Sequence, residues 1–129
     1  MHKSFSLIEL MLVLVIIGVL ASLVAPRLRG RAQRARTIAA KADIEANMSA
    51  ALDLYEMDLG FYPKELGDLV NTPVGQDAWA GPYLKKTPKD PWQRDYHYQT
   101  PGIHNQDYDL ASAGKDGVLG NDDDVFNWE

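Results

Sequence analysis

Four aspartates near the C-terminal end of the chain could hold a cation. In the stretch SAGKDGVLGNDDDVFNW, Asp116 is followed by the run Asp122–Asp124, with glycines in between. Neighbouring carboxylates repel one another, and Ca²⁺ offsets the repulsion by taking roughly six to eight oxygen ligands from carboxylates and carbonyls. The spacing does not follow the EF-hand pattern. Composition therefore leaves two alternatives open, a calcium loop and a solvated acidic turn.

A single carboxylate, Glu9, lies at the start of an apolar stretch. Residues 4–26 read SFSLIELMLVLVIIGVLASLVAP, and no charge occurs from residue 10 to residue 25. About 20 apolar residues suffice to cross a bilayer, and a charge inside the span costs about 2.5–3.5 kcal/mol at its centre and less near its end. The position favours a positively charged partner for Glu9. If the chain were cut before Phe5, the new α-amino group could pair with Glu9 of a staggered neighbour and set the register of an assembly.

Two simpler interpretations of this stretch stay open. A secretory signal peptide would be removed after the apolar run, although the run is long for one and continues into an arginine-rich helical pattern. An ordinary single-span anchor could let Glu9 reach the membrane surface with its flexible side chain.

Catalytic motifs are absent from the sequence. The three histidines, His2, His97 and His104, are scattered, and neither a zinc-protease HExxH nor a GxSxG motif occurs. The chain has no cysteine, which excludes thiol catalysis and disulfides. Consecutive aspartates in a glycine-rich loop are not two carboxylates held apart across a cleft. We therefore expect that the protein is not an enzyme.

Charge divides the chain into a basic and an acidic part. Residues 1–42 carry a net charge of +6 and residues 43–129 a net charge of −11, which gives −5 in total. The acidic part argues against nucleic acid as a partner. The arginines of residues 27–36 could contact lipid headgroups, contact acidic faces of neighbouring subunits, or form a solvated helix face.

One long helix is expected to position these residues. Strong helix formers continue to Leu59, with an apolar stripe at spacings of three and four, so a helix from about Phe5 to about Leu59 would be about 80 Å long. Gly60 suits a C-cap and Pro63 cannot continue the helix.

The sequence of residues 61–129 predicts a small folded part, the head, that contains a sheet. Residues 61–90 are rich in loops, with one short helix in KELGDLV. A turn at Asp90-Pro91 precedes a strand with Tyr96 and Tyr98 on one face, and QDYDLAS reads as its antiparallel partner. The predicted fold is α+β, a long helix packed against a sheet of about three strands.

The N-terminal stretch resembles the class III signal of type IV pilins and pseudopilins. That resemblance implies a short basic leader at residues 1–4, cleavage between Ser4 and Phe5, methylation of Phe5, and an assembly role for Glu9. Pro26 falls where the family helix usually kinks. Ser4 departs from the family, which has glycine before the cut. The resemblance places the C-terminal part outside the cytoplasm, whereas the arginines alone predict the opposite orientation.

The rest of the chain resembles the major pseudopilins of type II secretion systems, through LGFYP, KDPW, SAG-D, NDDDV and NW in this order. This resemblance implies one structural Ca²⁺ held by side chains of Asp116, Asp123 and Asp124, with backbone carbonyls between Leu110 and Gly120. It implies an assembly helix that spans the membrane at residues 5–26 and a periplasmic head at residues 27–129.

The function implied is that of a filament subunit. It would polymerise with its own copies and with minor pseudopilins, after processing by a prepilin peptidase, and would be driven by an inner-membrane assembly platform. Before assembly it would sit in the inner membrane, among lipids, as a single-pass protein, and the growing filament would export folded proteins across the outer membrane. A type IV pilin for adhesion, motility or DNA uptake is the first alternative. A membrane-anchored calcium-binding module that never polymerises is the second.

Overall fold

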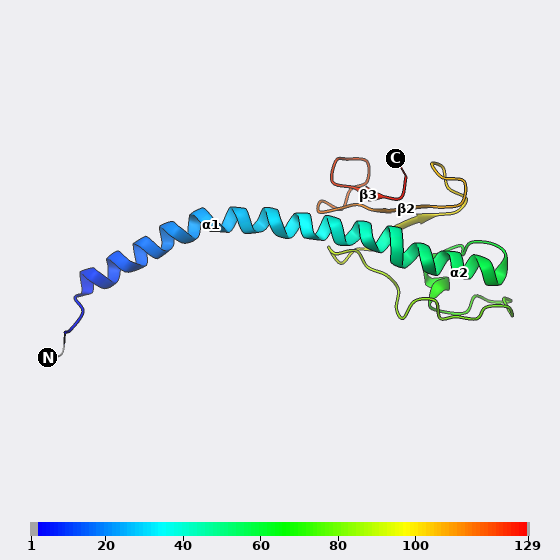
Figure 1. The fold of residues 1–129 in the computed structure, drawn as a ribbon, viewed down its shortest axis with the longest axis horizontal. Coiled ribbons are helices and arrows are strands. Elements are labelled where there is room, and N and C mark those ends of the chain that lie inside the picture. The colour runs from blue at the N-terminus through cyan, green and yellow to red at the C-terminus, as the bar shows by residue number, and fades with distance from the viewer. Residues whose placement is uncertain (1–2, 129) are drawn as a thin grey trace. The chain divides into compact units, whose positions relative to one another are not determined.

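The computed structural model describes residues 3–128, which form two units divided after Ala35. Figure 1 shows the path of the chain from its N-terminus to its C-terminus. Met1 and His2, which are half of the predicted leader, lie outside the described residues. Glu129 also lies outside them. The two units are described one by one.

The first unit is the N-terminal part of helix α1, which runs from Leu7 to Ala42. The large apolar side chains from Phe5 to Leu28 are exposed. By length and composition this helix could cross a membrane, since an 18-residue window has a mean hydropathy of 2.9 and none of it is buried. Pro26 lies inside α1, and the helix continues through it.

The long helix is confirmed from Leu7 to Leu59, and one segment within it departs from α-helical geometry. A π-helix, η1, occupies Asp43–Met48 between α1 and α2, and α2 covers Ser49–Leu59. Gly60 ends α2 as expected, with a φ of 84° and its N–H donated to the carbonyl of Glu56 at 2.7 Å.

The spacing of buried residues explains the π-helix. Ala40, Ile44, Met48 and Leu52 are all buried and follow one another at intervals of four. Each residue advances an α-helix by about 100°, so three steps of four drift by about 120° away from the core. A turn closed by i→i+5 hydrogen bonds takes up about one extra residue and rotates the stripe back. Burial of these side chains thus selects the wider turn.

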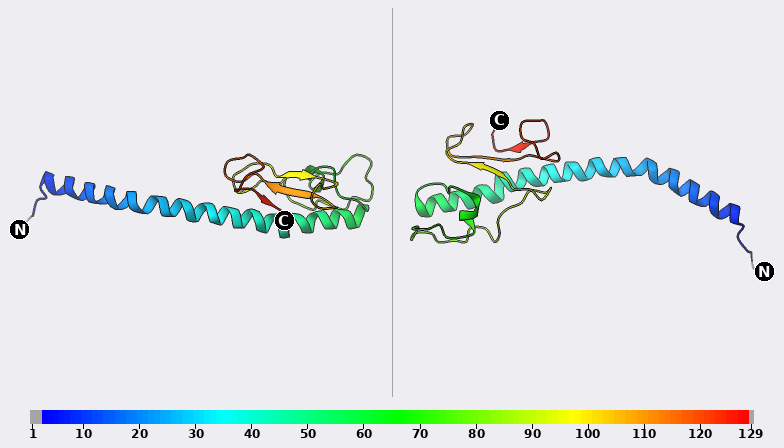
Figure 2. Two further views of the ribbon diagram at one scale, coloured as in Figure 1. Left: turned by 90° about the horizontal axis from the view of Figure 1, so that it is seen from above. Right: turned by 180° about the vertical axis from the view of Figure 1, so that it is seen from behind.

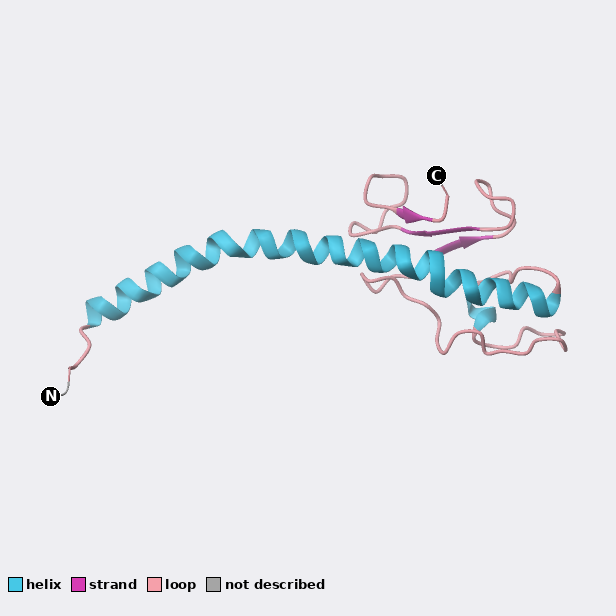
Figure 3. Cartoon of the chain, viewed as in Figure 1, coloured by secondary structure: helices cyan, strands magenta, loops and turns pink. Residues whose placement is uncertain are grey.

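The head contains a three-stranded antiparallel sheet in the order β1-β2-β3. Its strands are β1 His97–Gln99, β2 Asp109–Ser112 and β3 Val125–Phe126. Tyr98 lies opposite Leu110, which confirms the two predicted strands and their antiparallel pairing. The third strand comes from the end of the acidic stretch, where the sequence analysis placed only loop. Figure 3 shows that loops make up most of the remaining head.

The core of the head lies between the helix and the sheet. In the left view of Figure 2, the strands and loops of the head lie along one side of the helix. Segment 61–90 closes the core through Leu66 and Leu69 of the 3₁₀-helix η2, Leu66–Leu69, which confirms the short helix expected there. The core cluster comprises Ala40, Ile44, Met48, Ala51, Leu52, Tyr55, Leu66, Leu69, Tyr96, Tyr108, Leu110 and Val125.

Candidate functional site

The N-terminal segment begins with a capping box that fixes Glu9. The N–H of Ser6 donates to Glu9 Oε2 at 2.9 Å, and the N–H of Glu9 donates to Ser6 Oγ at 3.2 Å. Two donors at the start of α1 are thereby satisfied. Sequence reasoning missed this role, although Ser-x-x-Glu before an apolar run is its signal. Ser4 and Phe5 precede the helix, and Phe5 is 84% exposed.

The acidic loop is held at its start by a buried turn. Asp90 is 1% exposed and accepts hydrogen bonds from the N–H of Trp92 and of Arg94 at 3.0 and 2.8 Å. Its second oxygen accepts from the hydroxyl of Ser112 at 2.7 Å, and Ser112 Oγ accepts from the N–H of Gly114 at 3.2 Å. The KDPW turn is therefore tied to the first residues of the loop. The sequence analysis placed Asp90 in this turn, but its burial and its hydrogen bond to Ser112 could not be read from the sequence.

Arg94 adds a second tie to the same loop. Its Nη1 donates to the carbonyls of Gly114 and Lys115 at 2.8 and 3.1 Å. Gly114 has a φ of 64°, and a Cβ there would overlap the carbonyl of Asp123. The first and last segments of the acidic loop are consequently in direct contact at Gly114 and Asp123.

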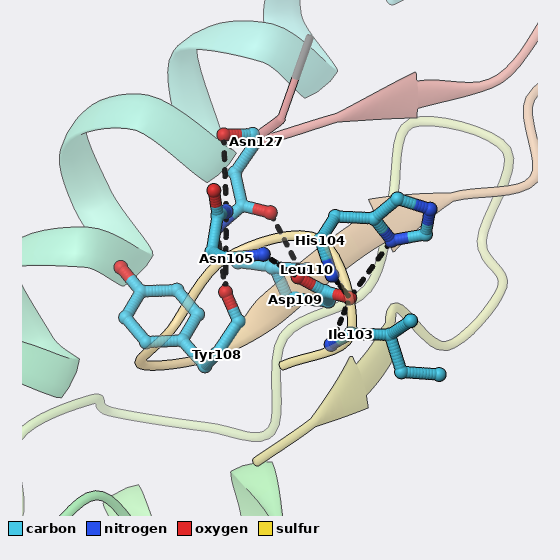
Figure 4. A network of polar contacts seen from close by, with 7 residues as sticks. All are labelled: Ile103, His104, Asn105, Tyr108, Asp109, Leu110 and Asn127. Atoms are coloured by element: carbon cyan, nitrogen blue, oxygen red, sulfur yellow. Dashed lines mark hydrogen bonds and ion pairs between the residues drawn. The ribbon is translucent and has the colours of Figure 1, made fainter. Parts of the chain in front are cut away.

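A polar network around Asp109, which Figure 4 shows, holds the loop between β1 and β2. Asp109 Oδ2 accepts from the N–H of Ile103 and of His104 at 2.8 and 2.9 Å, and Oδ1 accepts from the N–H of Asn105 at 2.9 Å. The Nδ1 of His104 lies 2.9 Å from Asp109 Oδ2. Burial would raise the pKa of Asp109, but these donors together lower it to about 2.

The network reaches the C-terminal residues through Asn127. The N–H of Leu110 donates to Asn127 Oδ1 at 2.9 Å, and Asn127 Nδ2 donates to the carbonyl of Tyr108 at 3.2 Å. The ring of Trp128 stacks on His104 with centroids 4.2 Å apart. The acidic loop is thus held at its start by Asp90 and Arg94 and just after its end by Asn127.

The three aspartates assigned as metal ligands lie in one hydrogen-bonded loop. The N–H of Asp116 donates to Asp123 Oδ2 at 3.0 Å, and the N–H of Gly120 donates to Asp124 Oδ2 at 2.6 Å. Asp116 faces other partners, because its oxygens accept from the N–H of Val118 and the amide of Asn121. Among residues 3–128, no three carboxylate, imidazole or thiol groups are close enough together to hold a metal ion.

Two carboxylate oxygens in this loop are left without a donor. Asp123 Oδ1 and Asp124 Oδ1 are both buried and have no hydrogen-bond partner. A buried acceptor without a partner costs about 1–3 kcal/mol and calls for an explanation such as a bound ion. The two unpartnered atoms are both carboxylate oxygens, which are ligands that a hard cation prefers. Asp123 and Asp124 therefore fit a cation, and Asp116 would join them only after a change of side-chain direction.

Two family descriptions match adjacent parts of the chain. Residues 1–25 match the prokaryotic N-terminal methylation motif, and residues 27–128 match type II secretion system protein G. The chain belongs to the type II secretion system protein G family.

Relatives over nearly the full length agree with this family. The chain is 44% identical to the type II secretion system core protein G of Escherichia coli K12, over 98% of this chain and 91% of that protein. It is 43% identical to the core protein G of Pseudomonas aeruginosa PAO1, over 99% of this chain and 96% of that protein.

A solved structure of the family has the same fold. The crystal structure of the major pseudopilin from the type 2 secretion system of enterohaemorrhagic E. coli matches with a TM-score of 0.65 and 35% identity, over 78% of this chain and 89% of that one. The long helix with a small antiparallel sheet is thus the pseudopilin fold. The chain is a structural pseudopilin of type II secretion, and the type IV pilin alternative is set aside.

Proposed function

We propose that this pseudopilin polymerises into a pseudopilus that drives the export of folded proteins across the outer membrane. The observation that carries the proposal is the succession of a methylation motif over residues 1–25 and a protein G domain over residues 27–128 in one chain. The first part supplies a membrane and assembly helix, and the second supplies a head. The protein acts through assembly and has no catalytic role.

Assembly requires a maturation step at the N-terminus. A prepilin peptidase removes Met1–Ser4 and Phe5 is methylated, after which the subunit waits in the inner membrane on residues 5–26 with its head in the periplasm. Glu9 then pairs with the Phe5 amine of a neighbouring copy. The exposed apolar surface of α1 supports this step, because a water-soluble helix would not leave it uncovered. The partners are further copies, minor pseudopilins and the inner-membrane assembly platform.

One structural Ca²⁺ completes the head. Asp123 and Asp124 would supply the first ligands through their unpartnered oxygens, joined by Asp116 and by backbone carbonyls between Leu110 and Gly120. The ion would offset the repulsion of these carboxylates and would link folding to metal concentration. A free calcium concentration 100 times the dissociation constant adds about 2.7 kcal/mol to the free energy of unfolding.

The maturation step is tested by the intact mass of the protein from membranes that contain a prepilin peptidase. We expect the loss of Met1–Ser4 and the gain of one methyl group, followed by filaments when the assembly platform is co-expressed. An uncut mass would mean that Ser4 blocks processing. The anchored, non-polymerising module would then be the better interpretation.

The calcium site is tested by Asp123→Ala combined with Asp124→Ala. We expect the double variant to melt at a temperature that no longer depends on calcium, since it lacks both unpartnered carboxylates. Asp122→Ala serves as the control, because it removes an exposed charge from the same run. A double variant whose melting still rises with calcium, as in the unmodified protein, would refute the site.

A further inference from the structure

A dense group of arginines directly follows the apolar stretch of α1. We call residues 27–36 the arginine segment; its charged members are Arg27, Arg29, Arg31, Arg34 and Arg36. All five are exposed, and no acidic residue occurs from residue 10 to residue 42. Within residues 3–128, no ion pair joins any of them to a carboxylate. Their charge is therefore available to a partner outside the chain.

We propose that the arginine segment binds the phosphate groups of anionic phospholipids at the surface of the bilayer that holds residues 5–26. The proposal rests on the membrane placement given under the proposed function and adds a lipid preference to it. Its occupant is the headgroup layer on the side where the head domain lies.

The position of the arginines along the helix places them at this surface. An α-helix rises about 1.5 Å per residue, so Arg27 and Arg29 lie within about 5 Å of Pro26 along the axis. The polar layer on each side of the hydrocarbon core is about 5–7 Å thick. Arg34 and Arg36 lie about 12 and 15 Å beyond Pro26, outside that layer. Contact with phosphate should consequently be strongest for the first two arginines.

The residue types in the segment suit phosphate. Guanidinium groups bind phosphate through two parallel hydrogen bonds, which ammonium groups cannot do. Arg27, Arg31 and Arg34 are spaced by four and three residues and so share one face of α1. Gly30, three positions after Arg27, lies beside this face and has no side chain that could compete with a headgroup for space.

A bilayer surface suits the arginine segment better as a partner than the acidic head of a second copy does. Every inserted chain meets the membrane surface next to residue 26, whereas a neighbouring head is met only on assembly. One arginine close to an anionic surface contributes about fivefold in affinity, and the attraction fades within a Debye length of about 8 Å. These values predict that replacing an arginine weakens the binding of anionic lipid less, the farther that arginine lies from residue 26.

The test uses the full chain reconstituted in phosphatidylcholine bilayers with trace spin-labelled phosphatidylglycerol or phosphatidylcholine. Electron paramagnetic resonance gives the fraction of each probe that the protein immobilises. We expect the unmodified chain to prefer phosphatidylglycerol severalfold. The pair Arg27→Gln with Arg29→Gln should lose most of this preference, while Arg34→Gln with Arg36→Gln should keep more than half of it. Both pairs remove the same charge, and glutamine keeps the helix.

Three results would overturn the proposal. An inserted chain that binds both lipid probes equally has no anionic lipid site, and this result leaves the proposed function intact. Equal losses in the two pairs would show an effect of net charge without headgroup contact. Unchanged lipid preference in both pairs, combined with weaker crosslinking between copies, would assign the arginines to a neighbouring head. A chain that fails to enter bilayers would instead refute the membrane placement and the proposed function with it.

Discussion

At the scale of single residues, Gly114 controls the shape of the acidic loop, and Asp109 controls the shape of the β1–β2 loop. Gly114 is in contact with the backbone of Asp123, and Asp109 collects the N–H groups of the β1–β2 loop. Neither residue supplies a side chain to the proposed cation site, whose carboxylates are those of Asp116, Asp123 and Asp124. Their substitution therefore tests the scaffold of the head while these three carboxylates stay in place.

Replacing Gly114 with alanine should destabilise the head more than the same change at Gly120. Both glycines have a positive φ, but a Cβ at Gly114 would overlap the carbonyl of Asp123, whereas nothing lies within 4 Å of one at Gly120. We expect Gly120→Ala to cost about 1–2 kcal/mol for the left-handed backbone. Gly114→Ala should cost about 1–3 kcal/mol more, because the loop must move. Thermal melting followed by the near-ultraviolet signal of the tryptophans measures both; equal losses would contradict the contact.

Asp109 should make the head sensitive to acid. Its pKa is lowered to about 2, below the unfolded value of about 3.9, so its contribution to stability is present above about pH 4. That contribution is lost as the pH falls towards 2. Asp109→Asn should lower the melting temperature at pH 7 and weaken its dependence on pH between about 4 and 2.

The control for this change is Asp107→Asn, which removes an exposed charge from the β1–β2 loop just before Asp109. Melting temperatures of the three proteins across this pH range give the comparison. If Asp109→Asn and the unmodified protein lose stability in parallel on acidification, the hydrogen bonds to Asp109 do not have the role assigned here.

At the scale of elements, the π-helix η1 reconciles a four-residue repeat with an α-helix. The stripe Ala40, Ile44, Met48 and Leu52 would leave the core on a regular helix, and the wide turn at Asp43–Met48 returns it. Side chains across the turn help to hold it, since Asn47 Nδ2 donates to Asp43 Oδ1 at 2.7 Å and the hydroxyl of Tyr96 donates to Asp43 Oδ2 at 3.3 Å. Tertiary packing thus changes the type of helix at this point.

Deletion of the exposed Ala46 should convert η1 into ordinary α-helix. The buried positions would then recur at intervals of four, three, four and three, as an α-helix needs. We expect a melting temperature equal to or above that of the unmodified protein, because no core contact is lost. Deletion of the exposed Leu54, which shifts Tyr55 away from the core, should instead lower it strongly. A large loss from the first deletion would mean that the wide turn has a role beyond register.

At the scale of the whole molecule, Glu9 has one role in the single chain and a second in the proposed filament. In the chain it closes the capping box with Ser6. In a filament it would pair with the Phe5 amine of a neighbour. Glutamine can replace glutamate in a capping box but carries no charge, so one substitution separates the two roles.

Glu9→Gln should abolish filament formation while the protein is still cleaved and still inserted in the membrane. Ser6→Ala, which removes the cap and keeps the charge, should leave filaments and cost about 1 kcal/mol at the helix start. Electron microscopy and sedimentation of sheared filaments measure assembly, and intact mass confirms processing. If Glu9→Gln still forms normal filaments, pairing with the Phe5 amine is refuted, and the capping box is the remaining role of Glu9.

The sequence by itself determined the elements that depend on local pattern. The apolar stretch, the long helix, the Gly60 cap and the first two strands all follow from periodicity and turn residues within a few positions of one another. The motifs from LGFYP to NW indicated the family in the same way. The capping box of Ser6 was equally local and could have been predicted.

Only the tertiary structure decided the features that depend on distant residues. The π-helix arises because the core fixes the direction of four side chains at once. The third strand forms because Val125 and Phe126 find β2 as a partner. Asp90 and Arg94 form hydrogen bonds with residues that lie 22 and 20 positions further along the chain. The unpartnered oxygens of Asp123 and Asp124 exist only once the acidic loop is closed. Such contacts depend on how the chain folds back on itself, and residue spacing carries little information about that.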